Sequence, residues 1–160
     1  MFGSSRFTYL IFFLALLGPA LSATYYRVDD RTPARVHEEG GLWSWNPQGT
    51  GSIVDHVYNR LGQEDPWVST TSDKNFAKAS AKSAGIVYIY KINPRGLDLV
   101  DTMEDFANQN EEHPHPGEME FSVKGFIPWE NIRGWDVYRR GKKIDSMTRQ
   151  EFERQLETCG

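Results

Sequence analysis

The segment Glu118-Met119-Glu120-Phe121-Ser122-Val123 alternates polar and apolar side chains, as a β-strand with one face in the core does. Alternate residues of a strand point to the same side and lie about 6.6 Å apart. The pattern therefore places Glu118 and Glu120 on one face and Met119 on the other. Two acids on one face enter either a shared cleft or the solvent. Taken alone, the pair favours the solvent, because charged side chains are mostly exposed.

The residues before this strand are predicted to form a stiff, extended loop. Each proline in His113-Pro114-His115-Pro116 disfavours the helical conformation of the residue before it. Two histidines so close together could suggest a metal site, but no third ligand lies at a suitable spacing. The sequence therefore predicts a structural loop here and no metal site.

Two other predicted strands carry polar side chains. Trp67-Val68-Ser69-Thr70-Thr71 is short, aromatic and β-branched, and Tyr25-Tyr26-Arg27-Val28 is a short strand followed by Asp29 and Arg31. Hydroxyl groups are common in strands, and a single arginine says little. The informative feature is the order along the chain: an arginine, then Ser-Thr-Thr, then Glu-x-Glu.

Helices are predicted mostly early in the chain and strands mostly late, which indicates an α+β fold. Residues 86–92 and 134–138 are the clearest further strands. Capping residues predict four helices, which begin after Thr32, Ser52, Ser72 and Thr148. The second helix should extend past Leu61 to Gly62, and the last should reach about Glu157.

The first 23 residues are interpreted as a secretory signal peptide. Arg6 is the only charge before Arg27, an apolar run occupies residues 9–17, and small residues surround Ala23. The apolar run is shorter than the ~20 residues that a membrane-spanning helix needs. A buried N-terminal helix is the alternative. The signal interpretation predicts a secreted, extracellular protein without a stable membrane span, whose mature part is residues 24–160.

Composition favours one globular domain with a sizeable core. The chain of 160 residues has a formal net charge of −4, which argues against nucleic acid as a main partner because phosphates require a basic surface. Cys159 is the single cysteine, so no disulfide can form within the chain. Its thiol would be either free or joined to a second chain, as an oxidising compartment permits.

The order of polar segments resembles the Arg–Ser-Thr-Ser–Glu signature of the mono-ADP-ribosyltransferases of the cholera toxin and heat-labile enterotoxin A-chain family. No single motif is specific, but five segments match in order, and together they extend over nearly all of residues 25–138. They are residues 26–33 with Gly40-Gly41-Leu42, Asp55-His56, the Ser-Thr-Thr strand, Pro114–Glu120, and Ile127-Pro128-Trp129 with Gly134-Trp135.

The resemblance implies an ADP-ribosyltransferase fold with a split two-sheet β core and flanking helices over residues 24–160. It also implies NAD as the substrate and an arginine of a target protein as the acceptor. Cleavage of the nicotinamide–ribose bond builds positive charge on the ribose, and a fixed carboxylate stabilises a charge where it develops. The resemblance assigns this role to Glu120. Glu118 would orient the acceptor and take its proton, since a guanidinium is a poor nucleophile until deprotonated.

The remaining roles implied by the resemblance concern the cofactor. Ser69 would hold Glu120 in place by a hydrogen bond, and His56 would help to hold the nucleotide. Arg27 would clamp a phosphate or ribose oxygen with its fork of donors. The predicted cofactor-binding set is Arg27, Asp29, His56, Ser69 and Thr70.

Two other functions stay open from the sequence. The same fold could act mainly as an NAD glycohydrolase, with water as the acceptor. A protein of a different class, a secreted aromatic-rich binding module without activity, would have no need for Glu-x-Glu together with Arg27 and Ser69. The segment between Leu42 and Ile53 is shorter than its counterpart in the family, so inhibition by a gating loop is not expected.

The signal-peptide interpretation makes a direct prediction. Cleavage after Ala23 should give a secreted chain whose N-terminal sequence begins at Thr24. N-terminal sequencing or intact-mass measurement of the secreted protein checks this. A mature chain that retains residues 9–17 would show that the segment is not a signal peptide.

Overall fold

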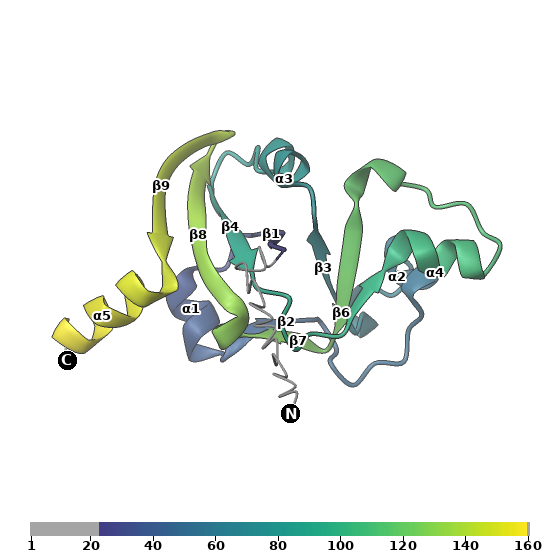
Figure 1. Cartoon of the computed structure of the whole chain (residues 1–160), viewed down its shortest axis with the longest axis horizontal. Helices are drawn as coiled ribbons and strands as arrows, with labels where there is room; N and C mark the ends of the chain where they lie inside the picture. Colours follow the sequence, from purple (N-terminus) through teal and green to yellow (C-terminus); the bar gives the residue numbers. More distant parts are fainter. Residues whose placement is uncertain (1–22, 160) are drawn as a thin grey trace, which may run out of the picture.

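The computed structural model describes residues 23–159, so the predicted signal peptide, apart from Ala23, lies outside the described residues (Figure 1). The described chain consists of short helices and strands, which confirms the α+β class. The strands are β1 Tyr25–Asp29, β2 Gly41–Trp43, β3 Trp67–Thr71, β4 Ile86–Ile92, β5 Leu99–Asp101, β6 Glu120–Lys124, β7 Phe126–Pro128, β8 Ile132–Arg139 and β9 Lys142–Thr148. The helices are α1 Pro33–Glu38, α2 Ile53–Val57, α3 Lys74–Ser80, α4 Thr102–Asn108 and α5 Arg149–Cys159.

The strands form a seven-stranded sheet in the order β5-β6-β3-β1-β4-β8-β9 and a separate pair, β2-β7. Every neighbouring pair is antiparallel. In Figure 1, β8, β9 and α5 lie on the left, β3, β6, α2 and α4 on the right, and α3 above and between them.

The large sheet is nearly divided between β1 and β3. These strands share a single residue pair, Tyr26 with Thr71, whereas β1–β4 and β3–β6 are each paired along five residues. The predicted split of the β core is therefore a separation of β1 from β3 within one sheet. Three predicted site residues come from the strands around this division: Arg27 from β1, Ser69 from β3 and Glu120 from β6.

One hydrophobic core serves both halves of the divided sheet. Its largest cluster joins Val68 and Val123 of the β3–β6 half to Tyr90 and Trp135 of the β4–β8 half. The two halves are thus held together by packing below the division, and the division can stay open without exposing the core. A smaller cluster around Phe106 packs α2 and α4 against β3 and β5 at the right-hand end of Figure 1.

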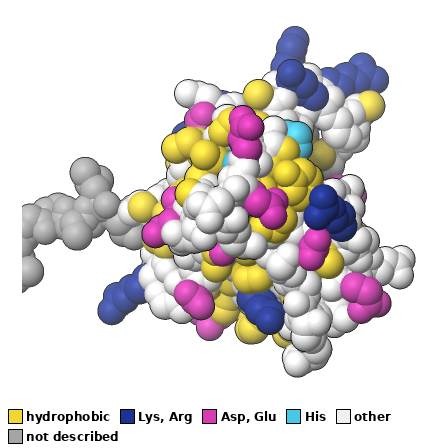
Figure 2. All heavy atoms as spheres, turned by 90° about the vertical axis from the view of Figure 1, so that its right-hand side faces the viewer, with side chains coloured by type: hydrophobic (Ala, Val, Ile, Leu, Met, Phe, Trp, Pro, Cys, Tyr) yellow, Lys and Arg dark blue, Asp and Glu magenta, His cyan; other side chains and the backbone are white. Residues whose placement is uncertain are grey.

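That right-hand end of the molecule has a mixed surface. Hydrophobic and acidic side chains are interspersed on it, with histidine visible among them (Figure 2). Within residues 23–159, no helix has the length and apolar character required to cross a membrane.

Most predicted elements are present, but their ends differ in four places. The second helix ends at Val57 instead of Gly62, because Asn59 has a left-handed backbone conformation (φ 55°) that interrupts it. The third helix is capped by Asp73 instead of Ser72. The final helix has the predicted Thr148–Glu151 capping box but continues through Cys159, which was expected to follow it. The fourth difference concerns Glu118 and is described below.

Candidate active site

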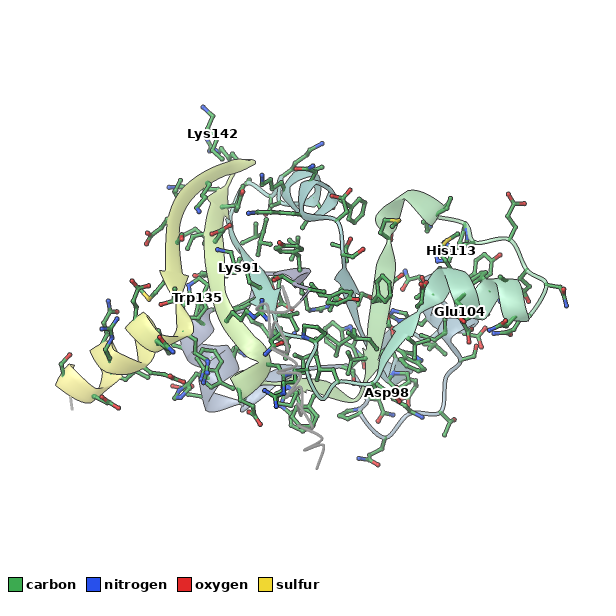
Figure 3. All side chains as sticks on the ribbon, in the orientation of Figure 1. Lys91, Asp98, Glu104, His113, Trp135 and Lys142 are labelled. Atoms are coloured by element: carbon green, nitrogen blue, oxygen red, sulfur yellow. The ribbon has the colours of Figure 1, made fainter. Side chains whose placement is uncertain are left out.

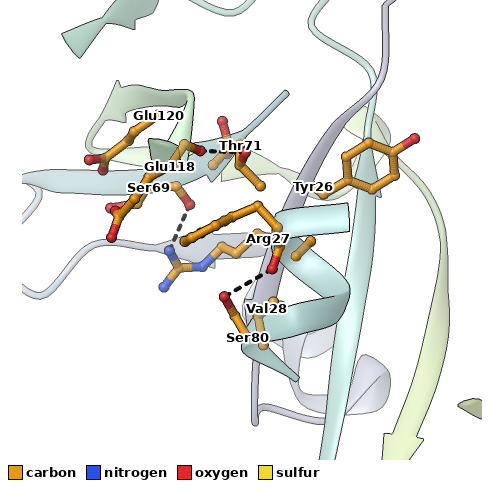
Figure 4. Close-up of a pocket in the computed structure, with 11 residues that line it drawn as sticks. Tyr26, Arg27, Val28, Ser69, Thr71, Ser80, Glu118 and Glu120 are labelled. Atoms are coloured by element: carbon orange, nitrogen blue, oxygen red, sulfur yellow. Dashed lines mark hydrogen bonds between the residues drawn. The ribbon is translucent and has the colours of Figure 1, made fainter. Parts of the chain in front are cut away.

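Arg27 spans the division in the sheet. Its Nη1 donates a hydrogen bond of 2.9 Å to the backbone oxygen of Ser69, and its Nε donates one of 2.9 Å to Asp29. Because β1 and β3 share only one residue pair, this side chain provides a contact that the backbone ladder lacks at this point. Figure 4 shows the guanidinium reaching from β1 to the β3 backbone.

Asp29 fixes the arginine side chains on this side of the site. Its carboxylate, 5% exposed, also binds the backbone and guanidinium of Arg31, with Arg31 Nη2 at 2.7 Å. Burial alone would raise the pKa of Asp29, but hydrogen bonds from Arg31 and the charge of Arg27 outweigh it and lower the pKa to about 2. Asp29 was predicted to bind the cofactor; the structure places it in the lining of the larger of two adjoining cavities, and both of its oxygens already accept hydrogen bonds.

Glu120 is a buried acid at the start of β6. Its Oε1 lies 3.2 Å from His56 Nε2 and accepts a hydrogen bond of 3.1 Å from Ser122 Oγ. Burial raises the pKa of Glu120, but hydrogen bonds from His56 and Ser69 lower it further than burial raises it. The carboxylate is therefore ionised, fixed and largely removed from water.

His56 reaches Glu120 from α2. Its Nε2 also lies 2.9 Å from Ser69 Oγ, and its Nδ1 lies 2.6 Å from Asp65 Oδ2. Burial lowers the pKa of His56, but hydrogen bonds and charges from Glu120 and Asp65 raise it above its usual value overall. Three predicted residues, Ser69, His56 and Glu120, thus form one hydrogen-bonded cluster.

Glu118 is not on the strand that was predicted to hold it. It ends a 3₁₀ turn, Pro116–Glu118, and Met119 adopts a left-handed conformation (φ 47°) before β6 begins at Glu120. Pro116 favours the turn, and Thr71 Oγ1 holds it by donating a 2.6 Å hydrogen bond to the Glu118 backbone oxygen. The expected strand alternation is therefore wrong here, although both glutamates line the same cavity (Figure 4).

Thr70, which was predicted to bind the cofactor, is among the residues that line this cavity, and it also makes a structural contact. It follows Ser69 on β3, so its side chain leaves the opposite face. Its hydroxyl donates a 2.6 Å hydrogen bond to the backbone oxygen of Phe121 and so ties β3 to β6. Thr70 thereby supports the strand that carries Glu120.

The loop before β6 is anchored by His113, which is labelled in Figure 3. The backbone N–H of His115 donates to His113 Nδ1 at 3.0 Å, so the ring carries its proton on Nε2 and donates it to Thr102 Oγ1 at 3.0 Å. Thr102 in turn donates to the backbone oxygen of Glu120 at 3.1 Å. The His-Pro segment has the structural role that was predicted. Among residues 23–159, no group of three or more potential ligands could hold a metal ion.

Two adjoining cavities open at the division in the sheet. The smaller, of about 160 Å³, is lined by Arg27, Ser69, Phe76, Glu118 and Glu120 among others. The larger, of about 790 Å³, is lined by Arg31, Trp43, Trp45 and His56 among others. Arg27, Val28 and Ser69 line both. Together their linings supply carboxylate, arginine and aromatic side chains.

Two further members of the cluster, Asp65 and Ser122, were not predicted from the sequence. Ser122 is two residues from Glu120 on the same strand, so alternation alone would place it on the same face. Asp65 has no comparable local signal, because only the fold brings it to His56. Phe76, on α3, also lines the smaller cavity.

Comparison with known families decides where this arrangement belongs. The sequence model of the family described as heat-labile enterotoxin alpha chain matches residues 7–156. The chain belongs to this family. The enterotoxin alpha chain family is the one whose motifs the sequence resembled, and the fold prediction is confirmed.

Individual members of the enterotoxin family match only in part of their length. NAD(+)--arginine ADP-ribosyltransferase Chelt of Vibrio cholerae is 32% identical, over 82% of this chain and 24% of its own. The heat-labile enterotoxin A chain of Escherichia coli is 29% identical, over 78% of this chain and 54% of its own. The heat-labile enterotoxin IIA, A chain, of Escherichia coli is 28% identical, over 79% and 53%. The chain thus spans from a quarter to about half of these relatives.

Solved structures share the fold. Scabin toxin from Streptomyces scabies, in complex with NADH, has a TM-score of 0.63 and 28% identity, over 78% of this chain and 72% of that chain. A guanine-specific ADP-ribosyltransferase has a TM-score of 0.63 and 26% identity, over 78% and 74%. A heat-labile enterotoxin has a TM-score of 0.60 at 24% identity, over 82% and 77%.

The low pKa of Asp29 predicts a pH-dependent contribution to stability. The folded-state pKa lies near 2 and the unfolded value near 3.9, so the contribution is present above about pH 4 and is lost as the pH falls toward 2. Asp29→Asn should lower the free energy of unfolding by about 2 kcal/mol at pH 7 and by about half as much at pH 3. Urea unfolding at both pH values measures this. An equal loss at both would show that Asp29 is not stabilised by its charge.

Proposed function

We propose that this chain is a secreted mono-ADP-ribosyltransferase that transfers ADP-ribose from NAD to an arginine of a target protein. The observation that carries the proposal is the buried, ionised Glu120, held by His56, Ser69 and Ser122 at the end of a cavity that Arg27 also lines. Membership of the enterotoxin family and the likeness to a toxin bound to NADH support it.

Glu120 suits the chemistry of NAD cleavage. As nicotinamide leaves, its electron pair departs with it and the ribose carbon becomes positively charged. A carboxylate already fixed and desolvated stabilises that charge without reorganising first. The hydrogen bonds from His56 and Ser122 both reach Oε1, and the ribose with its 2′-hydroxyl would lie in the cavity that Glu120 lines.

Arg27 would donate hydrogen bonds to the diphosphate or ribose oxygens of NAD. Two of its nitrogens are engaged, with Asp29 and with the backbone of Ser69. Its Nη2 has no hydrogen-bond partner among residues 23–159, and its side chain is 24% exposed between the two cavities. A guanidinium held in this way offers a fixed donor to an anionic group.

Glu118 would bind and deprotonate the acceptor arginine. It is partly exposed at the smaller cavity, whereas Glu120 is buried within it. A carboxylate at the opening can bind an incoming cationic guanidinium and remove its proton, which makes it nucleophilic. The guanidinium nitrogen then attacks the ribose carbon. With water in place of arginine, the same site would hydrolyse NAD.

Substitutions of the two glutamates should therefore have different effects on NAD hydrolysis and on transfer to arginine. Glu120→Gln should reduce nicotinamide release and transfer to an arginine substrate by at least about a hundredfold, because it removes the charge that both reactions need. Glu118→Gln should reduce transfer to arginine by a similar factor while it leaves NAD hydrolysis within about threefold of wild type. Both substitutions keep side-chain size, and a melting curve checks folding.

Three results would contradict the proposal. Full NAD hydrolysis by Glu120→Gln would remove Glu120 from the reaction. Undiminished arginine transfer by Glu118→Gln would show that this residue does not serve the acceptor. Transfer by the wild type to guanosine but not to arginine would assign the acceptor specificity of the guanine-specific structural neighbour instead.

A further inference from the structure

Asp65 is a partly buried carboxylate outside the motifs that point to NAD cleavage. It lies just before β3, and its side chain is 14% exposed. Its Oδ1 accepts a 2.9 Å hydrogen bond from the backbone N–H of Trp67, which fixes the orientation of the carboxylate. Its Oδ2 then faces His56 Nδ1 at 2.6 Å. One oxygen is thus used by the backbone and the other by the histidine.

The contact between Asp65 and Nδ1 determines which nitrogens of the His56 ring carry a hydrogen. A carboxylate only accepts hydrogen bonds, so Nδ1 must carry a hydrogen. Nε2 faces a second carboxylate, Glu120 Oε1, at 3.2 Å, together with the hydroxyls of Ser69 and Ser122 at 2.9 and 3.4 Å. An imidazole between two carboxylates is stabilised as the imidazolium, which donates from both nitrogens.

The charged groups around the His56 ring include two carboxylates in direct contact, which favour the imidazolium. Asp65 and Glu120 face it from the segment before β3 and from β6, and Arg27 of β1 lines the larger cavity with it. On α2 itself, the Asp55 carboxylate is bonded to Ser52 and Arg60. On α4, which packs against α2, Asp105 is partly exposed and binds Gln109. The two carboxylates that contact the ring are therefore Asp65 and Glu120.

We propose that Asp65 is a positioning residue, which acts on Glu120 through His56. Asp65 holds the His56 ring in one orientation, as an imidazolium whose Nε2–H points at the Glu120 carboxylate. The proposal rests on the function assigned to Glu120 above. Oε1 of the carboxylate would then be held by both His56 and Ser122 before NAD binds.

Asp65, His56 and Ser69 also resemble, in their distances, the triad of a serine hydrolase. There the imidazole must be neutral, so that Nε2 can take the proton of the serine. Here Nε2 also faces the carboxylate of Glu120, which favours a proton on this nitrogen. The same three side chains are therefore arranged to donate a proton toward Glu120 and not to activate Ser69.

Asp65→Asn tests the proposal with almost no change in shape. If its amide oxygen keeps the hydrogen bond from Trp67, the NH₂ group faces His56 Nδ1 and disfavours the imidazolium. Glu64→Gln is a matched control, because it removes a neighbouring exposed charge that binds only Asn46 among the described residues. Melting curves of both variants report on folding.

The first readout does not depend on activity. The chain has four histidines, so long-range ¹H–¹⁵N NMR can follow each ring through a pH titration. His56 should be doubly protonated at neutral pH in the wild type and in Glu64→Gln, and its pKa should fall in Asp65→Asn. A neutral His56 in the wild type at pH 7, or an unchanged pKa in Asp65→Asn, would overturn the proposal.

The second readout is the rate of nicotinamide release. In Asp65→Asn, kcat should fall by about tenfold to a hundredfold near pH 8, by analogy with the loss of outer partners of metal-bound histidines. The alkaline limb of the profile should move to lower pH, while KM for NAD stays within about threefold, because the contact serves the transition state. A loss that is equal at every pH, or equal to that of Glu64→Gln, would overturn the proposal. No cleavage by the wild type would instead contradict the proposed function, and the NMR titration would then decide the role of Asp65 alone.

Discussion

The contact between Arg27 and the Ser69 backbone is the constraint on which the site depends. A sheet that stops pairing between two of its central strands leaves backbone groups without ladder partners, and each unpaired buried group costs about 1–3 kcal/mol. Arg27 supplies a donor to one of them across the division. The strands can then diverge and open a cavity inside the sheet, while one hydrophobic core holds both halves together below it.

The charges of the site follow from this geometry. Arg27 sits beside Asp29, and Glu120 sits beside His56, which in turn sits beside Asp65. Each of these three acids is thus paired with a base, as buried charges require if their desolvation is to be offset. The pairs also fix the side chains before any substrate arrives. An electrostatic site of this kind needs little reorganisation when charge develops on the ribose.

The residues that could be predicted from the sequence are those recognisable from their neighbours or from the order of motifs along the chain. Arg27, Ser69 and Glu120 were identified from their order in three strands, and the fold brings them together as the resemblance implied. Ser122 could have been found by strand alternation. Asp65 could not, since its partner His56 lies on α2, beyond an intervening turn. Glu118 was placed on a strand because the alternating pattern extended over it, whereas Pro116 and the Thr71 hydrogen bond impose a turn there.

Binding of NAD to an Arg27→Lys variant tests the central claim most directly. Lysine keeps the charge but cannot bridge Asp29 and the Ser69 backbone while it also offers a third fixed donor. Calorimetry in the Glu120→Gln background avoids turnover during the titration, and a melting curve confirms folding. The account predicts that NAD binds at least about tenfold more weakly, a loss of about 1.4 kcal/mol. Affinity within about twofold of the parent would show that the arginine spanning the divided sheet does not form the NAD site.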